Sequence, residues 1–227
     1  MIKLHLGCGG RYLEGYVNID LPPTRHPMGT TSCSPDIEAD VTSICYPAGT
    51  VDEIRSHHLF EHFHRPVALA MLCRWRDWLT PDGLLRIETP DAWASFRLMM
   101  SPFHSFDAKQ QVMRHLFGSH EADWAIHADG WYKEKFHVTL TGLGFKQIRF
   151  ERNRWGVLRS IEVYARKSSE SFSRERYELE VRRLLAHSTV RVTEKEPQGT
   201  ELRMLEEWMN IWRKSYDAAA ESQESST

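Results

Sequence analysis

The chain has 227 residues, of which 41% are hydrophobic, and this length suits one α/β domain of ~150 residues with an extension. Its formal net charge of −2 gives no reason to expect nucleic acid or an anionic membrane surface as a partner. No apolar run reaches the ~18 residues of a membrane span, and we expect no signal peptide. The four cysteines lack C-x-x-C spacing, so we expect a cytoplasmic protein with reduced thiols.

A strand that ends in a glycine turn opens the chain. Leu4 and Leu6 lie in a short apolar run that stops at Gly7, and Gly9 and Gly10 follow closely. Glycine permits positive φ and lets a ligand approach the backbone. A G-x-G turn after a buried strand is typical of nucleotide-binding α/β domains.

A second strand, over residues 16–21, ends in an acidic residue. Asp20 at its tip can accept hydrogen bonds from both ribose hydroxyls of a nucleoside, or it can cap the turn before Pro22. The third glycine of the dinucleotide fingerprint is absent, and Asp20 follows Gly9 by eleven residues instead of ~20. Little room remains for a first helix, so a pyrophosphate would be poorly held.

The rest of the chain alternates strand and helix patterns, which predicts an α/β fold. Further strands are expected at 37–41, 51–54, 84–91, 145–150 and 160–165, the last two as an antiparallel pair. Helices are expected at 66–79, 93–100, 107–117, 131–143, 174–186 and 200–219. The loop at 22–36 is a candidate lid, and about 101–130 form a helical insertion. Residues 1–167 thus make up the domain, and 168–227 a C-terminal helical extension with a frayed tail.

Six short motifs, taken in their order along the chain, resemble those of a known family. They are Leu6-Gly-Cys-Gly9, Asn18-Ile-Asp20, Ala39-Asp-Val41, Leu59-Phe-Glu-His62, Leu79-Thr-Pro-Asp-Gly-Leu-Leu-Arg-Ile87 and Gly144-Phe145. In this order they resemble the class I S-adenosylmethionine-dependent methyltransferases, over about residues 2–166. Asp82 and Phe60 stand where that family usually has glycine and leucine. The resemblance implies a Rossmann-like, seven-stranded, mostly parallel sheet with a final antiparallel strand.

Residues 15–20, 117–119 and His127 are similar to a smaller group of predicted methyltransferases, often found among sugar and cell-surface polysaccharide genes. The resemblance implies methyl transfer from S-adenosylmethionine to a hydroxyl or amine of a small-molecule or glycan acceptor. The sequence leaves little room for a helix that would bind a pyrophosphate. This is consistent with S-adenosylmethionine, because this sulfonium cofactor contains no phosphate.

The resemblance also implies the cofactor contacts, with Asp20 at the ribose and residues 39–41 at the adenine. Matched motif by motif, they fall on Leu6, Gly7, Cys8, Gly9, Asp20, Leu21, Asp40, Val41, His58, Leu59 and Glu61.

Three histidines are the candidates for a catalytic base, because histidine suits deprotonation near neutral pH. We favour His127, which lies where the family's insertion closes over the acceptor, ahead of His58 and His62. Trp124, Trp131 and Tyr132 either wall an acceptor pocket or pack in the core. Residues 88–91 end a strand and should border the same cleft.

Other functions fit parts of the same sequence. His58-x-x-Glu61-His62 matches a zinc hydrolase pattern, which needs one continuous helix that presents both histidines to the metal. No metal ligand follows from the resemblance, although His57, His58, Glu61 and His62 leave a metal-assisted transfer open.

The alternative from another functional class is a catalytically silent relative of the methyltransferases that serves as a binding or assembly subunit. The C-terminal helices, with Trp208 and Trp212 on or beside an apolar stripe, either pack on the domain or form a homodimer.

Overall fold

The computed structural model describes residues 1–25, 34–190 and 197–224. Its centre is one seven-stranded sheet with the order β3-β2-β1-β4-β5-β7-β6. The strands are β1 (Ile2–Leu6), β2 (Val17–Asp20), β3 (Ile37–Glu38), β4 (Val51–His57), β5 (Leu79–Pro90), β6 (Phe145–Trp155) and β7 (Leu158–Lys167). Only β7 runs antiparallel to its neighbours, β5 and β6. This confirms the Rossmann-like sheet with its final antiparallel pair.

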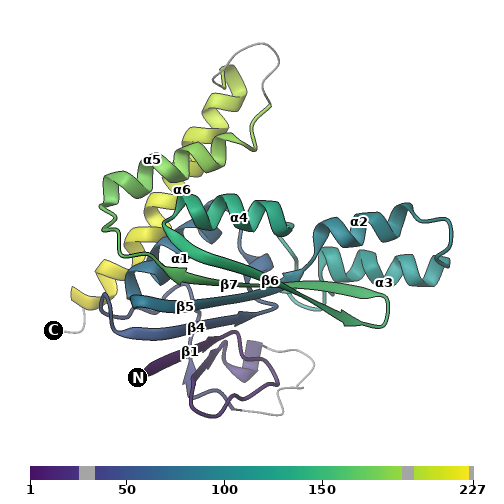
Figure 1. Cartoon of the computed structure of the whole chain (residues 1–227), viewed down its shortest axis with the longest axis horizontal. Coiled ribbons are helices and arrows are strands. Elements are labelled where there is room, and N and C mark those ends of the chain that lie inside the picture. Colours follow the sequence, from purple (N-terminus) through teal and green to yellow (C-terminus); the bar gives the residue numbers. More distant parts are fainter. Residues whose placement is uncertain (26–33, 191–196, 225–227) are drawn as a thin grey trace.

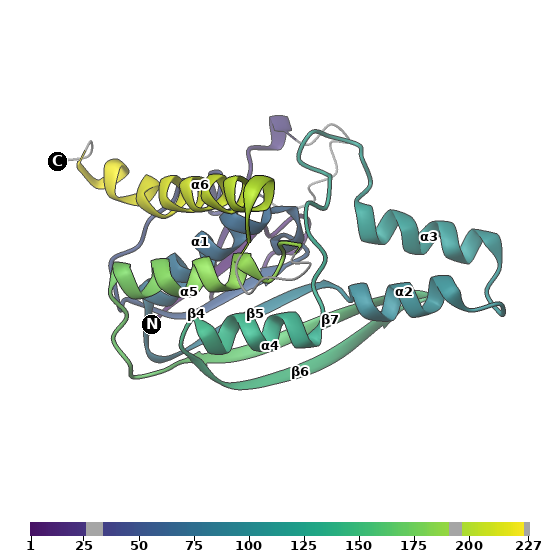
Figure 2. The ribbon, with the colours of Figure 1, turned by 90° about the horizontal axis from the view of Figure 1, so that it is seen from above.

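Six α-helices and two short 3-10 helices complete the described ranges. They are η1 (Pro23–Arg25), η2 (Phe60–His62), α1 (Arg65–Trp78), α2 (Ala92–Met100), α3 (Phe106–Phe117), α4 (Lys133–Gly142), α5 (Arg174–Ala186) and α6 (Gly199–Glu224). Helices α1, α4, α5 and α6 gather on one side of the sheet, while α2 and α3 project beyond one end of the strands (Figures 1 and 2). None of the described helices is long and apolar enough to cross a membrane.

Several boundaries differ from the sequence-based expectations. Strand β3 has two residues instead of the five at 37–41, because the Asp40 carboxylate accepts hydrogen bonds from Thr42 and turns the chain there. Residues 80–83, between the expected helix at 66–79 and the expected strand at 84–91, belong to β5 and form an irregularity in it, with Asp82 at φ 61°. Asp82 therefore adopts the left-handed conformation that favours glycine, and its carboxylate forms a 2.6 Å ion pair with Lys146.

The β6–β7 hairpin is longer than expected. The expected strands covered 145–150 and 160–165, but β6 continues to Trp155, which pairs with Leu158 at the start of β7. Cross-strand hydrogen bonding therefore carries these residues past the end of the neighbouring parallel strands, toward α3.

Side chains alternate between the two faces of the sheet along each strand, and the two faces differ in polarity. Leu85 and Ile87 of β5 are fully buried in the core, whereas Arg86 points to the other face. There its guanidinium hydrogen-bonds the Glu162 carboxylate at 2.9 Å and lies 3.7 Å from that of Glu53. One face is therefore apolar and the other carries paired charges, as expected of a sheet covered mainly on one side.

The C-terminal helices complete the core of the domain. Leu205, Met209 and Trp212 of α6 are buried in the same apolar cluster as the strands, together with Tyr177 of α5. Helix α6 packs along α1 (Figure 2), so its apolar stripe contacts its own domain. Residues 26–33 of the candidate lid at 22–36, and the last residues, 225–227, lie outside the described residues, and α6 extends to Glu224.

Candidate functional site

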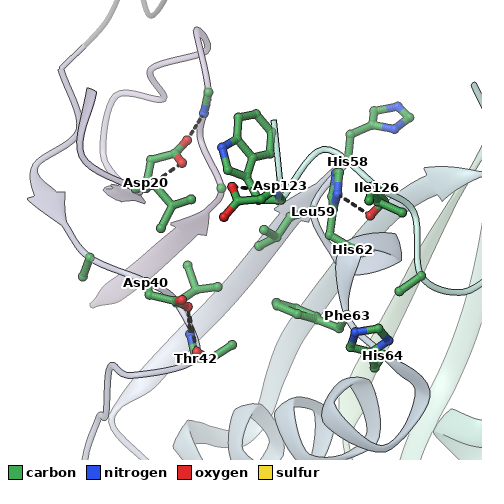
Figure 3. A pocket seen from close by; sticks show the side chains of 17 residues that line it. Asp20, Asp40, Thr42, His58, Leu59, His62, Phe63, His64, Asp123 and Ile126 are labelled. Atoms are coloured by element: carbon green, nitrogen blue, oxygen red, sulfur yellow. Dashed lines mark hydrogen bonds between the residues drawn. The ribbon is translucent and has the colours of Figure 1, made fainter. Parts of the chain in front are cut away.

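Two adjoining cavities open at the carboxyl ends of the parallel strands, where ligands bind in open α/β sheets. The first has a volume of about 400 Å³. In Figure 3, Asp20 and Asp40 lie on one side of it, and His58 and His62 lie on the other. Its remaining lining residues are Gly7, Gly9, Leu21, Ala39, Val41, Thr42, Leu59, Phe63, His64, Asp123, Trp124, Ile126 and Ala128.

The glycine turn closes one end of the first cavity. Gly7 has φ 65° and its backbone N–H donates to the Ile19 carbonyl at 2.8 Å. A Cβ on Gly7 would lie 2.9 Å from the Leu59 Cβ, so the β1 turn and the β4 loop touch here without room for a side chain. At Gly9, with φ 53°, a Cβ would meet nothing within 4 Å. The backbone is thus exposed to whatever occupies the cavity.

Replacing Gly7 with alanine should lower the free energy of unfolding by about 2–5 kcal/mol, because left-handed strain adds to a steric clash. The matched control is Gly15→Ala, where φ is 80° but the space is open. Strain alone should cost that variant about 1–2 kcal/mol. Urea unfolding of both variants measures the difference, and equal losses would show that the contact with Leu59 is unimportant.

The backbone fixes the Asp20 carboxylate at the tip of β2. Its Oδ1 accepts from the Leu21 N–H at 2.7 Å, and its Oδ2 accepts from the Gly9 N–H. These two bonds orient the Asp20 carboxylate, each oxygen of which can accept more than one hydrogen bond.

The structure brings most of the predicted cofactor residues to this cavity. Gly7, Gly9, Asp20, Leu21, Asp40, Val41, His58 and Leu59 line it. Leu6, Cys8 and Glu61 do not: the first two are buried behind the turn, and Glu61 lies beneath the histidines with 1% of its surface exposed. The motif positions Leu6 and Cys8 therefore serve packing, since neighbours in a strand or turn point to opposite sides.

The second cavity, of about 520 Å³, adjoins the first, and His58, His62 and Trp124 line both. It lies between β5, the insertion and the β6–β7 hairpin. Its other lining residues are His57, Glu88, Arg114, His115, Gly118, Ser119, Ala125, His127, Asn153, Arg154, Trp155, Leu158 and Ser160.

A hydrogen bond to Glu61 orients His58 between the cavities. His58 follows β4 with φ 50°, and its Nδ1 donates to Glu61 Oε1 at 3.0 Å. Its Nε2 lies 3.4 Å from Ser160 Oγ and 3.9 Å from Glu88 Oε1. Burial opposes the charged form, but the bond to Glu61 and the charges of Glu61 and Glu88 raise the pKa of His58.

The pKa values of three groups near His58 are lowered instead of raised. Burial and the charge of His58 lower the pKa of His115 to about 4, and burial likewise lowers that of His127. Although burial would raise it, hydrogen bonds from His57 and Asn153 lower the pKa of Glu88 to about 2. The cluster therefore combines ionised carboxylates with neutral imidazoles that keep a lone pair.

The remaining predicted site residues, His127 and three aromatic residues, lie in different parts of the structure. His127 lines only the second cavity, with Nε2 3.9 Å from Glu61 Oε1. Trp124 lines both cavities, whereas Trp131 is 2% exposed and stacks on Phe136 in the core. Tyr132 lines neither of these two cavities. Of the three aromatic residues, Trp124 therefore borders the cavities and Trp131 belongs to the core.

Some lining residues were not predicted from the sequence. Residues 153–155 reach the second cavity only because β6 is long, and His115 enters it from the buried side of α3. Apolar alternation in this segment ends at Phe150, and residues 151–154 are all polar, so no alternating pattern indicated the longer strand. No local pattern distinguished His115 from a surface histidine on its helix.

The continuous helix required by the zinc hydrolase pattern is not formed. His58 has a positive φ, and residues 60–62 form a single 3-10 turn before α1 begins at Arg65. His58 and His62 consequently do not lie one turn apart on one helix.

Comparisons with known proteins bear on the fold. No family model and no curated protein matches the sequence. A SAM dependent methyltransferase from Archaeoglobus fulgidus is 13% identical over 73% of this chain and 85% of its own, with a TM-score of 0.50. The 1,6-didemethyltoxoflavin-N1-methyltransferase of Burkholderia thailandensis is 15% identical over 74% of this chain and 71% of its own, with a TM-score of 0.49. The strand order and the likeness to the archaeal structure together show that this chain has the Rossmann-like fold of a SAM-dependent methyltransferase.

Proposed function

We propose that the protein is an S-adenosylmethionine-dependent methyltransferase that acts on a hydroxyl or amine of a small-molecule or carbohydrate-like acceptor. The observation that carries the proposal is the first cavity, where the glycine turn and Asp20 lie opposite His58 beside a second, larger cavity. A cofactor cavity that opens directly onto an acceptor cavity is what group transfer between two small molecules requires.

The residues of the first cavity fit the cofactor. Asp20 would accept hydrogen bonds from the ribose hydroxyls, and Asp40 and Val41 would border the adenine. The exposed backbone of Gly9 would lie against the amino-acid part, since a side chain there would fill the space. The connection from β1 to β2 is a loop without a helix, so it offers no helix N-terminus for a pyrophosphate, and this cofactor needs none.

His58 is the proposed base, in preference to His127. Its Nδ1 proton is committed to Glu61, which leaves the Nε2 lone pair directed to the second cavity. His58 also lines the boundary between the cavities, whereas His127 does not line the first.

The chemistry divides between the two cavities. When bound, S-adenosylmethionine supplies an electrophilic methyl group on a sulfonium. His58 Nε2 would take the proton of the acceptor hydroxyl or amine, and the ionised Glu61 would stabilise the imidazolium that results. Trp124 and Trp155 would hold an apolar or sugar face of the acceptor.

Calorimetric titration with S-adenosylmethionine tests the function, followed by transfer of its labelled methyl group into fractionated cell extracts. We expect one cofactor per chain and a labelled small molecule. Binding without any labelled product would favour the catalytically silent alternative, and absence of binding would contradict both the cofactor and the function.

His58→Ala should lower labelled methyl transfer by about 100-fold or more, as expected for a positioned base, while cofactor affinity falls much less. His137→Ala, on the exposed side of α4, is the control. A variant of His58 that retains full transfer would contradict its assignment as the base.

A further inference from the structure

Glu61, His62 and His127 form a compact group of potential metal ligands. One carboxylate oxygen and two imidazole nitrogens of this group all lie within 4.8 Å of one another. Ligands of a tetrahedral ion, bound at about 2.0–2.2 Å, lie about 3.4 Å apart. Small side-chain rotations would therefore bring these three atoms onto one ion.

The buried carboxylate has an oxygen that nothing in the described residues satisfies. Glu61 is 1% exposed, and its Oε2 is buried without a hydrogen-bond partner in the parts of the chain that the structure describes. His127 Nε2 is 3.9 Å from the other oxygen, Oε1, which is too far for a hydrogen bond. A buried, ionised carboxylate with an unsatisfied oxygen is costly unless a cation or donor completes it.

The group is held in place as metal ligands usually are. The Glu61 carbonyl accepts from the Ala128 N–H at 2.8 Å, which fastens the η2 turn to the insertion. His62 Nδ1 donates to the Ile126 carbonyl at 3.1 Å, leaving Nε2 with its lone pair, and His58 donates to Glu61 Oε1. Metal-binding histidines typically donate their second N–H to a carbonyl in this way.

We propose that Glu61, His62 and His127 bind one divalent transition-metal ion. Two imidazoles with one carboxylate suit Zn²⁺, Fe²⁺, Co²⁺ or Ni²⁺ better than Mg²⁺ or Ca²⁺, which prefer oxygen ligands. These ligands come from η2 and from the insertion, so they differ from the H-x-x-E-H set within one segment.

A neighbouring group, His57, His58 and Glu88, is the less suitable one. Its ligand atoms are equally close, but the His57 Nε2 already forms a 3.2 Å ion pair with Glu88 Oε2. Glu88 therefore has a partner without a metal, whereas Glu61 Oε2 does not.

An ion at Glu61 would keep open positions toward the second cavity, because His62 and His127 both line it. Three protein ligands leave room for a further ligand, and a metal lowers the pKa of an oxygen that it binds. Coordination of an acceptor oxygen by this ion rests on the proposed function, whereas binding of the ion itself does not.

The test is titration of untagged, chelator-treated protein with Co²⁺ and with Zn²⁺, followed by calorimetry and the visible spectrum of bound Co²⁺. It is done without S-adenosylmethionine, so its outcome is independent of the proposed function. We expect one ion per chain. His127→Ala and Glu61→Gln should weaken binding by at least about 100-fold, and His58→Ala, which removes the hydrogen bond to a ligand, by about 10–100-fold.

His137→Ala, on α4, should bind Co²⁺ as the parent does. Circular dichroism shows whether Glu61→Gln folds, and His127→Ala, at a partly exposed position, tests the site if it does not. The proposal is overturned if the parent binds no ion, or if binding survives in His127→Ala and is lost in His57→Ala, which would place the ion at Glu88.

Discussion

Replacing Asp20 with alanine is expected to remove most of the binding of S-adenosylmethionine while the protein remains folded. The carboxylate lines the first cavity and is oriented by the Leu21 and Gly9 amides. Two hydrogen bonds from ribose hydroxyls to a charged group contribute about 1.5–3 kcal/mol each. Their loss should weaken binding by about 100- to 10,000-fold, measured by calorimetric titration.

The control for Asp20 is Glu14→Ala, which removes an exposed charge of the same sign from the loop that precedes β2. Asp20→Asn keeps one acceptor oxygen, so its affinity for S-adenosylmethionine should lie between the affinities of Asp20→Ala and Glu14→Ala. Because Asp20 also receives a hydrogen bond from Gly9, urea unfolding of each variant must accompany the titration. Unchanged affinity in a folded Asp20→Ala protein would remove the ribose assignment and weaken the proposed function.

Arg76→Ala should cause the largest loss of stability among the charged residues of α1. Its side chain is 2% exposed and donates to the Glu170 carbonyl at 2.7 Å, the Tyr177 hydroxyl at 3.2 Å and the Gly144 carbonyl at 3.3 Å. Alanine would remove this donor from the carbonyl of Gly144 and the hydroxyl of Tyr177, both of which are buried, at about 1–3 kcal/mol for each group left unsatisfied. A total near 3–5 kcal/mol would lower the Tm by about 10 °C.

Arg176→Ala is the matched control, because both guanidinium groups lie over the ring of Phe172, at 4.1 Å for Arg76 and 3.9 Å for Arg176. Arg176 is 48% exposed and pairs with Glu170 at 2.8 Å. An exposed pair of this kind contributes about 0–1 kcal/mol. Similar shifts of the Tm in both variants, measured by thermal unfolding, would show that the C-terminal segment does not depend on the buried network.

Local patterns in the amino-acid sequence were sufficient to predict the order and type of the strands and helices. Apolar runs that stop at Gly7 and Asp20, and the helical periodicity after Pro66, are local signals, since one face of each element must be buried. The same signals predicted that Gly7, Gly9 and Asp20 come together, because carboxyl ends of neighbouring parallel strands meet at one edge of a sheet.

Two features became known only from contacts between distant segments: which histidines lie together, and which surface the C-terminal helices cover. His115 and His127 are far from Glu61 in sequence, and the packing of the insertion against η2 brings them to it. Trp212 gave the same apolar pattern whether it faced its own domain or a second chain, and in the structure it is buried in the core of its own domain, on the helix that contacts α1. Periodicity shows that a face is buried, but the partner that buries it depends on contacts between distant segments, which no local pattern encodes.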